Sequence, residues 1–265
     1  MRMKICIDPG HSKGYNPSPC GYGYYEGTRM YELSELLKKE LEKYENVKVI
    51  FSKKNIQDSP SLYDRAKAAE GCDLLISMHS NAAGSKVVNG TDYVAVFYSI
   101  DDTCKQLATD LANGIAKTME TKQAPQALKK YNGEKKADYY GIIRNARAMN
   151  IPCVLVEHSF HTDTKTTQWL MTLKNLQKLA EVQAEIIAKH YHLTKEDEEM
   201  RYETVADIKA DTMYGGAYLP TVQKLMKKGV LKGKGGNGDQ TIIDLGEDAV
   251  RLLVILDRQG AFDEE

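Results

Sequence analysis

The sequence contains no long apolar run, no paired cysteine motif and no recognisable secretory signal in its opening residues. None of its apolar stretches approaches the ~20 residues that cross a bilayer, so we expect no membrane span. The five cysteines are odd in number and form no C-x-x-C pair, which indicates reduced thiols in a protein made in a cytosol. The opening MRMKICID is basic but has neither an apolar h-region nor a small-residue cleavage site, so we expect no signal peptide.

The sequence also lacks a strong charge of either sign. The formal net charge of the 265 residues is −1. From Lys195 onward, 10 Lys and Arg face 15 Asp and Glu, a net of −5, so the part before it carries +4. No arginine-rich stripe and no interleaving of aromatic and basic residues accompanies this mild imbalance, and we expect no nucleic-acid partner.

Hydrophobic periodicity predicts the fold. Short apolar or β-branched runs alternate with longer stretches in which apolar residues recur at helical spacing, a pattern typical of an α/β fold with a mostly parallel twisted sheet flanked by helices. The expected strands are 4–8, 47–51, 73–78, 93–98 and 153–157, and the expected helices are 29–44, 103–120 and 166–191.

The pattern changes near residue 193. The charged stretch HLTKEDEEMRYE, residues 192–203, predicts a linker. A helical stripe that stops at Gly229 follows, and then a second amphipathic stretch with Asp244 and Glu247 at capping-box spacing. We therefore predict a first domain at 1–192, a linker at 193–202 and a small, mainly helical C-terminal domain at 203–265, which is too small for catalytic machinery of its own.

Histidines at the ends of predicted strands are the first candidates for chemistry. His11 follows the strand-like KICIDPG, and His79 ends the buried-strand pattern DLLISMH. Ligands of open α/β sheets bind at the carboxyl ends of the strands. By contrast, His190 and His192 close a long helix, and His158 and His161 lack the second pair that a structural zinc finger requires.

Two glutamates accompany these histidines. Glu157 ends the apolar strand CVLVE, where an unpaired carboxylate would be costly without a cation or a chemical role. Glu26 lies in the Gly- and Tyr-rich loop YGYYEG before a helix. Two imidazoles and a carboxylate are the usual protein ligands of a hydrolytic zinc ion, and a further glutamate nearby can take a proton from water.

Four motifs in order resemble one known family. DPGH, then a glutamate in a Gly-rich loop, then SMHSNA, then IPCVLVEHSF resemble the zinc-dependent N-acetylmuramoyl-L-alanine amidases of the Amidase_3 family, from about residue 3 to 190. SLYDRAKAA resembles the leucine–arginine stretch that this family carries before its second histidine. The family usually has a glycine and an asparagine where this chain has Ser159 and Asp163.

The resemblance implies roles for the candidate residues. His11, Glu26 and His79 would be the ligands of Zn²⁺, and Glu157 would be the catalytic carboxylate. The substrate would be bacterial peptidoglycan, cleaved at the amide between N-acetylmuramic acid and L-alanine. The residues alone indicate metal-assisted hydrolysis and do not identify peptidoglycan.

The resemblance and the expected lack of a leader favour a bacteriophage endolysin, held in the host cytoplasm until lysis and then acting on the wall. A mother-cell amidase of sporulation is the neighbouring alternative. A zinc peptidase or deacylase acting on a small amide, and a wall-binding protein with a decayed site, are the alternatives of other classes. The C-terminal domain would bind the wall, form an oligomer or stabilise the chain.

Overall fold

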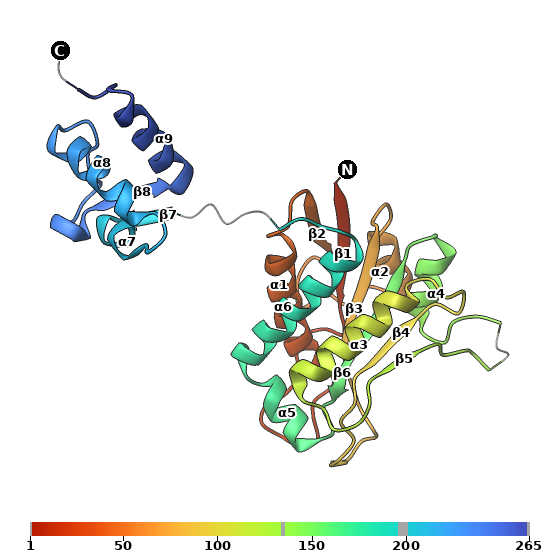
Figure 1. Cartoon of the computed structure of the whole chain (residues 1–265). Coiled ribbons are helices and arrows are strands. Elements are labelled where there is room, and N and C mark those ends of the chain that lie inside the picture. The colour runs from red at the N-terminus through yellow and green to blue at the C-terminus, as the bar shows by residue number, and fades with distance from the viewer. Residues whose placement is uncertain (1, 134–135, 196–200, 264–265) are drawn as a thin grey trace. The chain divides into compact units, whose positions relative to one another are not determined.

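The chain forms two compact units, residues 1–196 and 197–265, of which the computed structural model describes residues 2–133, 136–195 and 201–263 (Figure 1). Of the predicted linker 193–202, residues 196–200 lie outside the described ones, while Arg201 and Tyr202 begin strand β7. In these described stretches no helix has the length and apolar character needed to cross a membrane.

The first unit is built on a six-stranded sheet in the order β2-β1-β3-β6-β4-β5. Neighbouring strands are parallel except β4 and β6, which are antiparallel, so the predicted mostly parallel α/β sheet is confirmed. The sequence did not predict β5, a strand of three residues at the edge of the sheet. The strands are β1 (Met3–Pro9), β2 (Val47–Phe51), β3 (Leu74–Asn81), β4 (Ala95–Tyr98), β5 (Gln126–Leu128) and β6 (Cys153–Phe160).

Helices cover both faces of this sheet (Figure 1). One face packs against α1 (Glu26–Leu41), α3 (Lys105–Met119), α5 (Thr164–Leu170) and α6 (Leu173–His190). The other packs against α2 (Leu62–Ala68) and α4 (Gly141–Ala148). The single helix predicted over 166–191 is therefore two helices, because the chain turns at Met171 and Thr172.

Strand alternation decides which side chains face the smaller helical layer. Leu75 of β3 and Leu155 of β6 belong to the core beneath α2 and α4. Since side chains two residues apart share a face, His79 and Glu157 project to the same side, at the carboxyl ends of their strands. The candidate site therefore lies on the α2/α4 face of the sheet.

The second unit has its own small core. It comprises β7 (Arg201–Thr204), α7 (Val205–Ala210), α8 (Gly215–Lys227), the 3₁₀ turn Gly238–Gln240, β8 (Ile242–Gly246) and α9 (Glu247–Arg258). β7 and β8 pair antiparallel, and Tyr202, Tyr218, Val222 and Val250 are buried among the helices.

The predicted capping box at Asp244 and Glu247 is wrong. The residue that caps α9 is Gly246, and the Asp244 carboxylate instead pairs with Arg201 and Lys234. The capping box of this unit is at Thr204 and Asp207, where α7 begins.

Candidate metal centre and active site

Three residues from separate segments meet at the carboxyl edge of the sheet. His11 lies in the loop after β1, Glu26 is the first residue of α1, and His79 lies near the end of β3. One possible ligand atom of each lies within 4.8 Å of those of the other two. The structure thus brings together three of the four predicted site residues as one group that can hold a metal ion.

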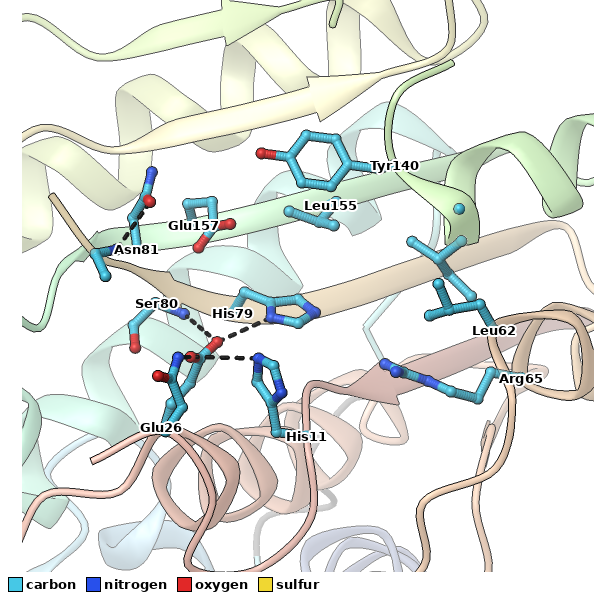
Figure 2. A pocket seen from close by; sticks show the side chains of 14 residues that line it. His11, Glu26, Leu62, Arg65, His79, Ser80, Asn81, Tyr140, Leu155 and Glu157 are labelled. Atoms are coloured by element: carbon cyan, nitrogen blue, oxygen red, sulfur yellow. Dashed lines mark hydrogen bonds and ion pairs between the residues drawn. The ribbon is translucent and has the colours of Figure 1, made fainter. Parts of the chain in front are cut away.

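The Glu26 carboxylate joins the two imidazoles (Figure 2). Its Oε1 lies 2.8 Å from Nδ1 of His79, and its Oε2 lies 3.4 Å from Nε2 of His11. The two imidazole rings meet edge to face, with their centroids 5.1 Å apart. Both histidines therefore direct a ring nitrogen at the same carboxylate.

Glu26 is buried and held in place by polar neighbours. It is 1% exposed, and it accepts hydrogen bonds from the backbone N–H of Ser80, at 3.1 Å, and from the side-chain amide of Asn16. Burial by itself would raise the pKa of Glu26, but the hydrogen bond and charge of His79 and the charge of His11 lower it to about 2. The carboxylate is therefore ionised and fixed, as a metal ligand must be.

The loop that carries His11 lies directly against the start of α1. A Cβ added to Gly27 would lie 1.9 Å from the carbonyl oxygen of Ser12, so only glycine allows this approach. His11 itself has a φ of 55°, in the left-handed region that non-glycine residues seldom occupy. The buried Lys53 ammonium donates to the His11 carbonyl and stabilises this turn.

Glu157 lies on the neighbouring strand, beside His79 (Figure 2). It is 8% exposed, and within the described part of the chain its Oε2 has no hydrogen-bond partner. Burial raises the pKa of Glu157 to about 7, against the opposing effect of His79 and with a further increase from Glu26. A carboxyl group in this state exchanges protons near neutral pH.

All four predicted site residues line a cavity of about 380 Å³. Its far wall is formed by Leu62 and Arg65 of α2 and by Tyr140 at the start of α4, and Figure 2 shows the Arg65 guanidinium directed toward His11 and His79. The cavity is therefore polar at the histidines and, apart from Arg65, largely apolar where the two short helices meet.

Several residues of the site had no role in the sequence-based hypothesis. Asn16 and Ser80 hold Glu26, while Arg65 and Tyr140 line the cavity. The only sequence signal for Arg65 was the SLYDRAKAA stretch, and Ser80 was visible only as the residue after His79. Asn16 and Tyr140 lie in loops whose paths the sequence pattern does not determine.

Two other histidines near the site, and Asp163, which departs from the usual family pattern, make hydrogen bonds within the fold. His158 is buried and bonds to the His79 carbonyl and to Gln183, while His161 is buried beside Ser80. Asp163 caps α5 by accepting from the Thr166 N–H. Of the described residues that line the cavity, none is Ser159 or Asp163.

Two imidazoles and a carboxylate form a donor set suited to a zinc ion with an open coordination position. An unpaired carboxyl group in the same cavity suits proton transfer in a hydrolysis. The fold and the site together thus define a class: an α/β protein whose sheet edge carries a cluster that can hold a metal ion beside a buried carboxyl group.

Comparison with known proteins narrows this class. The N-acetylmuramoyl-L-alanine amidase family matches residues 5–189, most of the first unit. The chain is 26% identical over 197 residues to the N-acetylmuramoyl-L-alanine amidase CwlM of Bacillus licheniformis, covering 73% of this chain and 70% of that protein. This chain therefore belongs to the N-acetylmuramoyl-L-alanine amidase family.

Solved structures share the fold of the first unit. The N-acetylmuramoyl-L-alanine amidase from Clostridium difficile 630 superposes with a TM-score of 0.61 at 22% identity, covering 72% of this chain and 97% of that one. The catalytic domain of CwlV from Bacillus (Paenibacillus) polymyxa gives 0.60 at 17% identity, covering 72% and 99%.

Proposed function

We propose that this chain hydrolyses the amide between N-acetylmuramic acid and L-alanine in bacterial peptidoglycan. The observation that carries the proposal is the meeting, in one cavity of a chain from this family, of the His11–Glu26–His79 cluster with the unpaired Glu157. Membership of the family supports the substrate, and the cluster supports the type of chemistry.

We propose His11, Glu26 and His79 as the ligands of a zinc ion. Their donor atoms are two imidazole nitrogens and a carboxylate oxygen that lie within 4.8 Å of one another, which fits the ligand set of hydrolytic zinc sites. When bound, zinc polarises the amide carbonyl and increases the acidity of water. Glu26 is already ionised and fixed by Ser80 and Asn16, so binding needs little ordering of this ligand.

Glu157 is the proposed proton carrier. Its Oε2 accepts a proton from the attacking water and delivers it to the nitrogen of L-alanine as the amide bond breaks. The products are the lactyl carboxylic acid of the muramic acid and a free L-alanine amino group. The raised pKa of Glu157, caused by burial, matches a group that must both accept and donate near neutral pH.

The second unit has the features of an accessory module. Its small core of helices and one short β-ribbon contains no metal cluster among the residues described. We propose that it binds the wall and so increases the local concentration of the first unit at its polymer. Self-association and simple stabilisation of the chain are the competing roles.

For the biological setting we propose a phage lysin, with a mother-cell amidase of sporulation as the alternative. Both use the same hydrolysis, so the proposed chemistry does not depend on the choice. Lysis of a bacterium after the enzyme is co-expressed with a membrane-permeabilising holin supports the first. Failure to lyse vegetative cells, with activity on spore wall, supports the second.

Digestion of purified peptidoglycan tests the reaction. The zinc-loaded enzyme should release L-alanine amino groups in step with stem peptides, without new reducing sugar ends. A Glu157→Gln variant is the matched control. Cleavage of small acyl amides with none of the wall amide would instead identify the zinc peptidase or deacylase.

A further inference from the structure

Arg65 is part of the cavity wall, and the proposed hydrolysis does not use it. Its Nε and Nη2 each donate to one oxygen of Asp8, both at 2.7 Å, in a two-point ion pair. Asp8 is fully buried and also accepts from the hydroxyls of Ser52 and Ser77. Because two of its nitrogens are fixed by a rigid acceptor, the guanidinium has one orientation.

That orientation leaves one end of the guanidinium available. Within the residues that the structure describes, Nη1 of Arg65 donates to no protein group. The side chain is 12% exposed, and that exposure opens into the cavity (Figure 2). A partly buried guanidinium N–H₂ group in the wall of a cavity is a binding group for an oxygen acceptor.

The charges around Arg65 favour an anionic acceptor. Lys53 is buried nearby and donates to the His11 carbonyl, which is uncharged. The carboxylates that act on Lys53 are Asp8, already paired with Arg65, and Asp58, which is partly exposed and accepts from the backbone of Lys54 and Asn55. The partly buried Arg65 and the buried Lys53 therefore share Asp8 as their buried carboxylate. Of the other carboxyl groups in the cavity, Glu26 is held by His79 and His11 and Glu157 lies beside His79, so a substrate carboxylate would balance the second cation.

We propose that Nη1 of Arg65 binds the free carboxylate of the stem-peptide residue that follows L-alanine. This rests on the proposed function and adds a substrate preference to it. That residue presents a carboxylate when it is isoglutamate and a carboxamide when it is isoglutamine, only a few bonds from the bond that is cleaved. The L-alanine methyl group then faces the apolar wall of Leu62 and Tyr140.

Two matched substrates test the preference. Muramyl tripeptides that differ only in isoglutamate or isoglutamine at the second stem position are given to the full-length zinc enzyme, and kcat/KM is measured for each. A charge-assisted hydrogen bond in a partly buried site predicts a preference of about 10-fold or more for the acid. The ratio does not depend on the amount of folded enzyme, so it separates substrate binding from stability.

Variants test whether Arg65 causes the preference for the acid substrate. Arg65→Ala should bring the ratio close to one, mainly through KM, and Arg65→Lys, which keeps a cation opposite Asp8, should reduce it. Lys130→Ala is the control, because Lys130 is a second cation near the cavity: it lies over the rings of Tyr139 and Tyr140 and its charge acts on Glu157. It should leave the ratio unchanged.

Three outcomes overturn the proposal: a wild-type ratio near one, a preference that survives loss of Arg65, or a preference that disappears in the Lys130 variant. The first needs no variant, so it decides the matter even if Arg65 variants fail to fold. Failure of the proposed function looks different, because then neither muramyl peptide nor purified wall would be cleaved before L-alanine.

Discussion

Glu157 is paired in register with His79 in neighbouring parallel strands, so both side chains leave the sheet on the same face. On its other side Glu157 is opposite Ala95 of β4, a small buried residue that leaves room for the carboxyl group. Of the two glutamates in the cavity, Glu26 is fixed against both imidazoles, while Glu157 keeps a free oxygen. The structure thus gives the two carboxyl groups different surroundings, and the first two predictions test whether they have different roles.

Glu157→Gln should retain the metal and lose turnover. The substitution removes the proposed proton carrier but none of the proposed ligands, and the loss of a general acid–base group lowers kcat by about 10²–10⁴-fold. Metal content by elemental analysis and turnover on purified wall are measured together. Loss of the metal from this variant would mean that Glu157 is a ligand.

Glu26→Gln, His11→Ala and His79→Ala should lose metal and activity together. Each removes one of three donors, and the remaining two hold zinc poorly. Chelation of the wild-type enzyme should abolish activity, and added zinc should restore it. Full activity of a metal-free enzyme in strong chelator would contradict the zinc hypothesis.

Asp8 should make the first unit sensitive to acid. Burial raises the pKa of Asp8, but the charge and hydrogen bonds of Arg65 and the hydroxyls of Ser52 and Ser77 outweigh it, so its pKa in the folded state is below the ordinary value. The resulting stability is present above the unfolded pKa of about 4 and is lost as pH falls through the folded pKa.

Asp8→Asn provides the comparison. It leaves the Arg65 charge without its buried partner and should lower the free energy of unfolding at pH 7 by about 3–5 kcal/mol. Urea unfolding at pH 7 and at pH 3 should show a smaller difference between the two proteins in acid. An unchanged difference would mean that the pair does not contribute as the geometry indicates.

Gly27→Ala should destabilise the first unit, because the added methyl group meets the Ser12 carbonyl at 1.9 Å and must displace the loop that carries His11. Gly216 is the matched control. It is also the second residue of a helix, and a Cβ there meets nothing within 4 Å. Gly216→Ala should be neutral or stabilising by up to about 1 kcal/mol. Thermal unfolding and zinc affinity of both variants check the contrast.

Removal of the second unit should separate wall binding from catalysis. A chain ending near residue 195 should fold, retain zinc and cleave soluble muropeptides as the full chain does. It should be slower on intact walls, and the isolated second unit should sediment with those walls. Because that part has a net charge of −5, binding should persist at high salt. A full chain that is a dimer, and a truncated one that is a monomer, would instead assign the second unit to assembly.

Much of the sheet and part of the site were predictable from local pattern. Apolar runs identified five of the six strands, and His79 and Glu157 were found because a polar residue ends a buried strand. The helices α2 and α4 were missed because they have only seven and eight residues, too few to show a clear stripe.

The remaining parts of the site depend on contacts between distant segments. The Arg65–Asp8 pair joins residues 57 positions apart. The position of Glu26 depends on how closely α1 approaches the loop after β1, which the sequence indicated only through its resemblance to a family. The helix break at Met171 and Thr172 has no proline or glycine to mark it.

The position of β6 between β3 and β4 has a consequence for how activity arises during folding. Without β6 the sheet consists of two separate pieces, β2-β1-β3 and β4-β5. During synthesis, the chain that contains His11, Glu26 and His79 leaves the ribosome well before Glu157 does. Because β6 lies between these two pieces, its insertion joins them and places the Glu157 carboxyl group beside His79. If Glu157 acts as proposed, a partly folded chain can gather His11, Glu26 and His79 and still be inactive, so that recovery of activity during refolding would report completion of the sheet.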